Sequence, residues 1–139
     1  MRVVGGLSGV AAVWLLACCS ASSSATGGIA VRMDDFKLHL TTTTAPPGQV
    51  KLRLDNSGPS THEINVDRTD LAAKDLPIRA DGLAVDEKSS LLTRMGSIEV
   101  VEAGDKATLT LDLPPGHYVL YCNLEGHYLG EMYANLDVR

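Results

Sequence analysis

Three residues with metal-binding side chains lie close together near the end of the chain, in the stretch YCNLEGHYLGEM from Tyr121 to Met132. Cys122, His127 and Met132 follow a C-x4-H-x4-M pattern. A thiolate, an imidazole and a thioether are donors that, with a second imidazole, form the ligand set of a mononuclear copper site. The sequence must therefore supply a second histidine and a fold that brings it to this loop.

The chain has four histidines, so three remain as candidates for the second imidazole. His62 opens the stretch HEINV, in which His62, Ile64 and Val66 share one face of a predicted strand. It is either the missing ligand or an ordinary interior histidine. His39 and His117 have no sulfur-containing neighbour, and we expect both to be ordinary strand residues.

Two residues of the motif also have interpretations without metal. Cys122 could be a buried structural thiol, because free cysteines are often buried. It could also be a catalytic thiol, although a nucleophile needs a base and an orienting group, and Met132 has no role in such a site. Met132 alone would be a core residue. The occurrence of all three in one loop favours a metal site.

Charge and cysteine content exclude some classes of protein. The chain has 12 Lys and Arg against 17 Asp and Glu, a formal net charge of −5. A nucleic-acid role is disfavoured because no basic patch is present to neutralise phosphates. Cys122 is the only cysteine in the segment 29–139, so the domain there is expected to have no internal disulfide.

The N-terminus is typical of a secretory signal peptide, which we assign to Met1–Ala17. Arg2 precedes a short, Gly-interrupted apolar run, which favours a cleaved signal over a permanent membrane span. The run ends in LLAC, which resembles a bacterial lipobox and implies cleavage before Cys18 and lipidation of its thiol. The alternative is an ordinary secreted protein cleaved near Ala21 or Ala25.

The Ser-rich segment 18–28 is small and polar, so it is predicted to be a flexible tether between the lipid and the domain 29–139. We therefore expect an exported protein, anchored by lipid to the outer face of the cytoplasmic membrane, in the periplasm or at the cell surface.

The domain shows the pattern of an all-β fold. Apolar residues alternate or run together in short segments separated by Gly, Pro and Asn turns, which predicts a sandwich of seven to eight strands in two sheets. The expected strands are 29–33, 36–40, 49–56, 62–66, 97–102, 107–113, 117–122 and 133–138.

One long segment, Arg68–Gly96, breaks this rhythm. It is charged, with scattered Leu and Ala, and is too long for an ordinary hairpin loop. We predict a partly helical crossover between the two sheets that packs on one side of the sandwich, with Asp86 as the N-cap of a short helix.

The segment Asn56–Val66 and the stretch YCNLEGHYLGEMYANLDV resemble the cupredoxin superfamily, specifically the small plastocyanin- and azurin-like blue-copper proteins of bacteria. The resemblance covers nearly all of 29–139, and the loop length is similar to that of rusticyanin-like and sulfocyanin-like members. It implies a Greek-key β-sandwich and one copper that alternates between Cu(I) and Cu(II). The implied ligands are His62, Cys122 and His127 in the equatorial plane, with Met132 as the long axial ligand.

The sequence departs from this pattern at two positions. Glu131 precedes the methionine where many relatives have glycine. Glu63 follows the first histidine where several relatives have Asn or Ser, which leaves open the group that braces the two ligand loops.

The resemblance implies transfer of single electrons and no enzymatic activity. A binuclear copper centre needs a second loop cysteine, and a multicopper oxidase needs a His-Cys-His bridge, whereas Tyr121 and Asn123 flank Cys122. The alternative function is copper homeostasis or delivery, and a metal-free interaction domain comes third.

We expect a monomer that meets redox partner proteins. In the family, electrons leave through the C-terminal histidine, here His127. Tyr128 and Leu129 beside it are expected to form an apolar docking patch, and the acidic surface would steer a basic partner.

Overall fold

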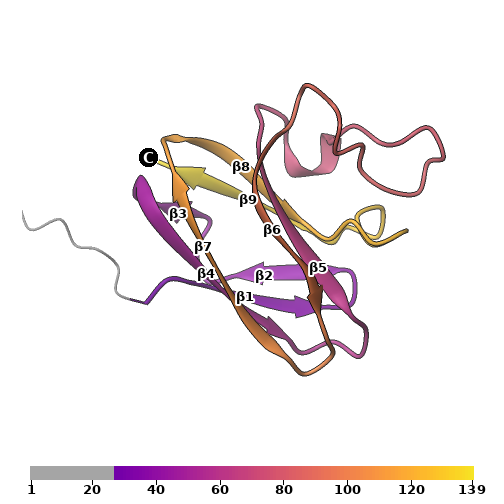
Figure 1. Cartoon of the computed structure of the whole chain (residues 1–139), viewed down its shortest axis with the longest axis horizontal. Helices are drawn as coiled ribbons and strands as arrows, with labels where there is room; N and C mark the ends of the chain where they lie inside the picture. The colour runs from indigo at the N-terminus through magenta and orange to yellow at the C-terminus, as the bar shows by residue number, and fades with distance from the viewer. Residues whose placement is uncertain (1–26) are drawn as a thin grey trace, which may run out of the picture.

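The computed structural model describes residues 27–139, which form nine strands in two sheets packed face to face (Figure 1). One sheet has the order β2-β1-β4-β7, and the other has the order β3-β9-β8-β5-β6. The strands are β1 (Ile29–Asp34), β2 (Lys37–Leu40), β3 (Thr44–Ala45), β4 (Gly48–Asn56), β5 (His62–Arg68), β6 (Thr93–Val101), β7 (Lys106–Leu113), β8 (Gly116–Tyr121) and β9 (Tyr133–Val138).

The predicted signal peptide, the predicted lipidation site Cys18 and nearly all of the predicted tether lie outside the described residues. Among the residues that the structure describes, none belongs to a helix long and apolar enough to cross a membrane.

Strand β4 shows how the sequence pattern produces the core. Val50, Leu52 and Leu54 point into the space between the sheets and are at most 5% exposed, whereas Lys51 and Arg53 face solvent. Successive side chains of a strand point to opposite faces, so alternation of this kind buries one face of the sheet. The all-β prediction is confirmed.

All eight predicted strands are present, with ends that differ by a few residues. The ninth, β3, lies at the edge of a predicted turn and pairs in parallel with β9 through Thr44 and Ala45 only. Two residues are too few to show a periodic pattern, so the sequence carries no signal for this strand.

The predicted crossover does not run between the two sheets. It joins β5 to β6, which are antiparallel neighbours in one sheet, so this part of the prediction was wrong. The crossover contains one short 3-10 turn, η1 (Ala73–Asp75). The helix predicted to begin at Asp86 is absent, and the chain makes two successive turns there, closed by Ser89 N–H to Asp86 O (3.0 Å) and Leu92 N–H to Ser89 O (3.1 Å). The side chains of Asp86 and Ser89 also accept backbone N–H bonds within these turns. Such local bonds compete with a helix, so the helix prediction was wrong.

The crossover covers the outer face of the second sheet, as expected of a segment that packs on one side. Figure 1 shows it looping out at the end of the sandwich where β8 and β9 are also joined. It contributes to a second apolar cluster outside the main core, made of Ala73, Leu76, Val85, Val119, Tyr121 and Tyr128.

Candidate metal centre

The pairing of β5 with β8 brings His62 to Cys122. The two strands are antiparallel neighbours, with Asn65 opposite Tyr121. The start of β5 therefore lies beside the end of β8, at the same end of the sheet. His62 is the first residue of β5, and Cys122 directly follows β8.

The loop between β8 and β9 is closed by its own backbone. Cys122 N–H donates to Met132 O, and Met132 N–H donates to His127 O, both at 3.1 Å. His127 N–H donates to Leu124 O at 2.9 Å. Cys122 and Met132 are fully buried, and His127 is half-buried. The structure thus gathers all three residues of the sequence motif in one tight loop.

The donor atoms of His62, Cys122 and His127 converge. Nδ1 of His127 lies 3.3 Å from Nδ1 of His62 and 3.4 Å from Sγ of Cys122. One ligand atom from each of the three residues lies within 4.8 Å of the others. Two imidazole nitrogens and a sulfur this close together have too few protons to satisfy one another's lone pairs by hydrogen bonds, so this arrangement fits a cation. With the thioether of Met132 in the same buried loop, the donor set suits copper.

Burial favours the metal-binding protonation state of His62 but disfavours that of Cys122. Desolvation lowers the pKa of His62, and His127 lowers it further, while Asp35 acts in the opposite direction. Burial raises the pKa of the Cys122 thiol, while the backbone N–H groups of Glu63 and Leu124 oppose that shift. His62 is therefore neutral and able to bind at neutral pH, whereas metal binding must displace a proton from Cys122.

Asn56, at the end of β4, orders the chain that leads to His62. Its fully buried amide donates to Ser60 O and to Val101 O, both at 2.8 Å, and its oxygen accepts from Gly58 N–H. Bulges in the pairing of β5 with β6 then interrupt the regular register beside His62. Bulges re-aim side chains. His62 is thus oriented by more than simple strand alternation.

Glu63 braces the two ligand segments. Its Oε1 accepts the backbone N–H of Asn123 at 3.0 Å and the side chain of Asn65 at 2.7 Å. The first bond joins the residue after His62 to the residue after Cys122. The sequence did not decide which group braces the two ligand loops. In the structure it is the carboxylate of Glu63.

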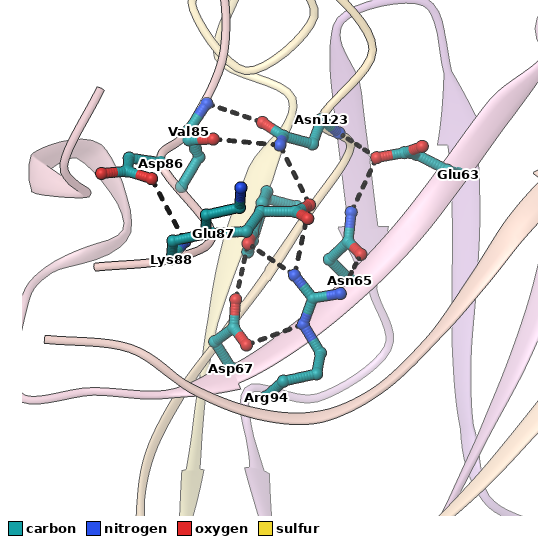
Figure 2. A network of polar contacts seen from close by, with 10 residues as sticks. Glu63, Asn65, Asp67, Val85, Asp86, Glu87, Lys88, Arg94 and Asn123 are labelled. Atoms are coloured by element: carbon teal, nitrogen blue, oxygen red, sulfur yellow. Dashed lines mark hydrogen bonds and ion pairs between the residues drawn. The ribbon is translucent and has the colours of Figure 1, made fainter. Parts of the chain in front are cut away.

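An ion pair between the buried carboxylate of Asp67 and the partly exposed guanidinium of Arg94 extends this brace, as Figure 2 shows. Arg94 donates from Nε to Asp67 Oδ1 and from Nη1 to Asn65 Oδ1, both at 2.8 Å. The Tyr121 hydroxyl donates to Asp67 Oδ2 at 2.5 Å. Burial lowers the pKa of Arg94, but the hydrogen bond and charge of Asp67 raise it more, so the guanidinium stays charged.

The crossover is tied to the ligand loop at the same place. The Asn123 side chain accepts from Val85 N–H at 2.7 Å and donates to Glu87 at 3.0 Å (Figure 2). Gly126 N–H donates to Leu83 O at 2.9 Å. A segment that carries no predicted ligand thus holds the ligand loop in place.

The turn between β1 and β2 also lies against the site. No sequence pattern predicted this contact. Asp35 Oδ1 is 3.2 Å from His62 Nε2. The ring centroids of Phe36 and His127 are 5.4 Å apart, and the two ring planes make an angle of 59°. Phe36 has a φ of 61°, an uncommon conformation for a non-glycine residue. No local pattern points to this turn, because its contacts depend on how the two sheets pack.

Two details of the ligand loop correct or explain sequence expectations. Tyr128 is 3% exposed, and its hydroxyl donates to Ala73 O and accepts from Leu76 N–H, so it is not part of a docking patch. Leu129 is 50% exposed. Glu131 has a φ of 74°, which explains why a glycine would suit this position.

His39 and His117 do not belong to the cluster of donor atoms. His39 pairs with Asp34 at 3.2 Å, and His117 pairs with Asp137 at 2.7 Å, both on partly exposed strand surfaces.

Solved structures of copper proteins share this architecture. An auracyanin from Roseiflexus castenholzii, in a dithionite-reduced form, matches with a TM-score of 0.58 and 18% identity over 79% of this chain and 94% of that one. Auracyanin A from Chloroflexus aurantiacus, described as a "blue" copper protein, matches with a TM-score of 0.52 and 17% identity over 81% of this chain and 100% of that one. Rusticyanin from Thiobacillus ferrooxidans matches with a TM-score of 0.57 and 12% identity over 79% of this chain and 76% of that one.

At these identities the likeness shows the fold, and a comparison with curated proteins found no match. The cluster of His62, Cys122, His127 and Met132 is consistent with one type 1 copper. A family model described as a cupredoxin-like domain matches residues 7–134, nearly the whole chain. The resemblance noted in the sequence is confirmed, and the chain belongs to the family of cupredoxin-like domains.

Proposed function

We propose that the protein is a single-electron carrier that holds one copper through His62, Cys122 and His127, with Met132 as a weaker axial ligand. The observation that carries the proposal is the convergence of two Nδ1 atoms and one Sγ, all within 4.8 Å of one another. Bound copper would supply a Cu(II)/Cu(I) couple, which a thiolate, thioether and imidazole set serves in both states.

The surrounding residues support electron transfer rather than substrate chemistry. His62, Cys122 and Met132 are fully buried, so bulk water does not reach these three donors. His127 is half-buried and provides the route to the surface. Because Glu63 and the loop's own backbone bonds fix the donors, their positions should change little between oxidation states.

Copper delivery is the alternative, and it makes a different demand on the site. A delivery protein must release its metal, which requires ligands that can move apart. The buried donors and the closed loop favour retention of copper.

We further propose that the protein is exported, anchored by a lipid on Cys18, and acts as a monomer on redox partner proteins. The basis is the lipobox-like sequence before Cys18 and the Ser-rich tether after it. Phe36 and Leu129, 48% and 50% exposed, are the apolar groups that a partner would meet near His127.

The copper proposal is tested by adding stoichiometric Cu(II) to the purified protein and recording visible and electron paramagnetic resonance spectra. An intense thiolate-to-copper band is expected, and Cys122→Ser should abolish it. A wild-type protein that binds copper but stays colourless would rule out a type 1 site.

Carrier and delivery protein are separated by voltammetry and by a Cu(I) chelator. A carrier should cycle reversibly at an electrode and resist the chelator when reduced. Irreversible cycling with rapid stripping would favour delivery.

The anchor is tested by labelling cells with a radioactive fatty acid. Wild-type protein should carry the label and Cys18→Ala should not. Label that persists in Cys18→Ala would contradict the proposed lipidation.

A further inference from the structure

Asp35 and His62 make a buried contact that the copper proposal does not by itself require. Asp35 Oδ1 lies 3.2 Å from His62 Nε2, and the imidazole is fully buried. Both atoms are shielded from solvent, and neither has a well-aligned hydrogen-bond partner within residues 27–139. Buried polar atoms without partners are costly, so the contact between these two is their main compensation.

Two neighbouring residues, Ser60 and Gly58, allow Asp35 to approach His62 this closely. Ser60 Oγ donates to the other carboxylate oxygen of Asp35 at 3.0 Å, which orients the side chain. Gly58 packs against both partners: a Cβ there would lie 2.9 Å from Asp35 Oδ1 and 3.2 Å from His62 Nε2. Any larger residue at position 58 would therefore push into the contact.

We infer that Asp35 is the positioning residue of the upstream histidine and lowers the reduction potential of the centre, an inference that rests on copper binding by His62. At 3.2 Å, Asp35 Oδ1 is close enough to accept the Nε2 proton after a small rotation of either side chain. That bond would keep the Nδ1 lone pair of His62 free on the side that faces His127 and Cys122. The negative charge of Asp35 also favours the more highly charged Cu(II) over Cu(I). The contact thus sets both the tautomer of His62 and the balance between oxidation states.

The charge is tested with Asp35→Asn, which keeps an acceptor oxygen. We expect the ratio of Cu(II) to Cu(I) affinity to fall about tenfold, a rise of about 59 mV in the potential. The matched control is Asp34→Asn, which removes the same charge from the adjacent residue. Asp34 bonds to Ser57, Arg32 and His39 instead, so this variant should shift the potential by less than half as much. Equal shifts in both variants would overturn the inference.

The positioning role is tested without copper. Nitrogen NMR of histidine-labelled apoprotein should show the His62 proton on Nε2 in the wild type and in Asp35→Asn. Asp35→Leu and Gly58→Ala should lose this protected signal, the first by removing the acceptor and the second by separating the partners. If Asp35→Leu does not fold, Gly58→Ala decides the question.

A wild-type apoprotein with the proton on Nδ1, or an unchanged signal in Gly58→Ala, would contradict the role of Asp35. A wild type that binds no copper yet shows the Nε2 proton would instead contradict the proposed function and leave the contact intact.

Discussion

The centre has two flanks that are built in different ways. The flank that lies against the crossover, called the crossover flank, is a network of hydrogen bonds between 2.7 and 3.0 Å on β5, β6 and the ligand loop. Its members are Glu63, Asn65, Asp67, Arg94 and Asn123. The turn flank, formed by Asp35 and Phe36, touches the two histidines through one polar contact at 3.2 Å and one ring contact. One flank joins backbone segments, and the other touches ligand rings.

This difference suggests a division of labour. A network that includes the nearly inaccessible carboxylate of Asp67 stabilises the fold, because each member satisfies a buried polar group of another. A single carboxylate against an imidazole contributes less to the stability of the fold. It acts directly on a ligand, and so on the reduction potential of the centre. We therefore expect changes in the crossover flank to alter stability and changes in the turn flank to alter potential.

Copper removal should have the largest effect and should involve both flanks. Because the metal binds the folded site far better than the unfolded chain, copper at about 1,000 times its dissociation constant stabilises the protein by about 4 kcal/mol. Calorimetry with and without copper measures this increment. His62→Ala should lose most of it, and His39→Ala and His117→Ala should keep it. Loss in His117→Ala with retention in His62→Ala would show that the upstream ligand is another residue.

The next largest effect is expected for Arg94→Met. Asp67 would keep only the Tyr121 hydroxyl as a partner for its buried charge, at a cost of about 3 kcal/mol in the free energy of unfolding. Denaturant unfolding of the apoprotein measures the loss. Arg32→Met is the control, because its pair with Asp34 is exposed and should contribute less than about 1 kcal/mol. A large change of potential with little loss of stability would reverse the assigned roles of the flanks.

Glu63→Ala should cost about 2 kcal/mol, because the backbone N–H of Asn123 loses its acceptor at a partly buried position. The ligand segments would also separate more easily, so we expect faster copper loss to a chelator. Glu63→Gln retains an acceptor and should come close to the wild type in both measurements. If Glu63→Ala releases copper no faster, the brace does not control retention.

A smaller effect is expected at Glu131, in the ligand loop. Its φ of 74° is unfavourable for a side chain that carries a Cβ, so Glu131→Gly should stabilise the apoprotein by about 1 kcal/mol. Thermal unfolding measures the change, and the copper spectrum should be retained. A destabilised variant would indicate that the Glu131 side chain makes compensating contacts.

The smallest effect expected is the pH dependence of the apoprotein through His62. Burial and His127 lower its pKa below the usual 6.5, so the unfolded chain binds more protons in the interval between the two values. Stability should therefore fall as the pH drops from about 6.5 toward the folded pKa, and level off below it. Comparing unfolding curves of the wild type and His62→Gln isolates this contribution. The same slope in both proteins would assign the dependence to other groups.

The sequence predicted those parts of the fold and site that depend on local pattern. Period-two alternation located eight strands, and the spacing of Cys122, His127 and Met132 marked the ligand loop because all three lie in one short segment. His62 needed the resemblance as well, because a buried strand histidine has no signature of its own. Asp35 and Phe36 were missed because they reach the site only through the packing of one sheet on the other. The helix predicted at Asp86 is absent because this side chain, expected to cap a helix, accepts the Lys88 N–H within a turn instead.

The ties between the crossover and the ligand loop have a kinetic consequence. Val85 N–H bonds to Asn123, and Gly126 N–H bonds to Leu83, so opening either segment breaks bonds that hold the other. Segments linked in this way exchange their amide hydrogens as one cooperative unit. The residence time of a bound ion would then depend on how often a stretch without any ligand unfolds. Substitutions in that stretch could lengthen or shorten it while every coordinating side chain is unchanged.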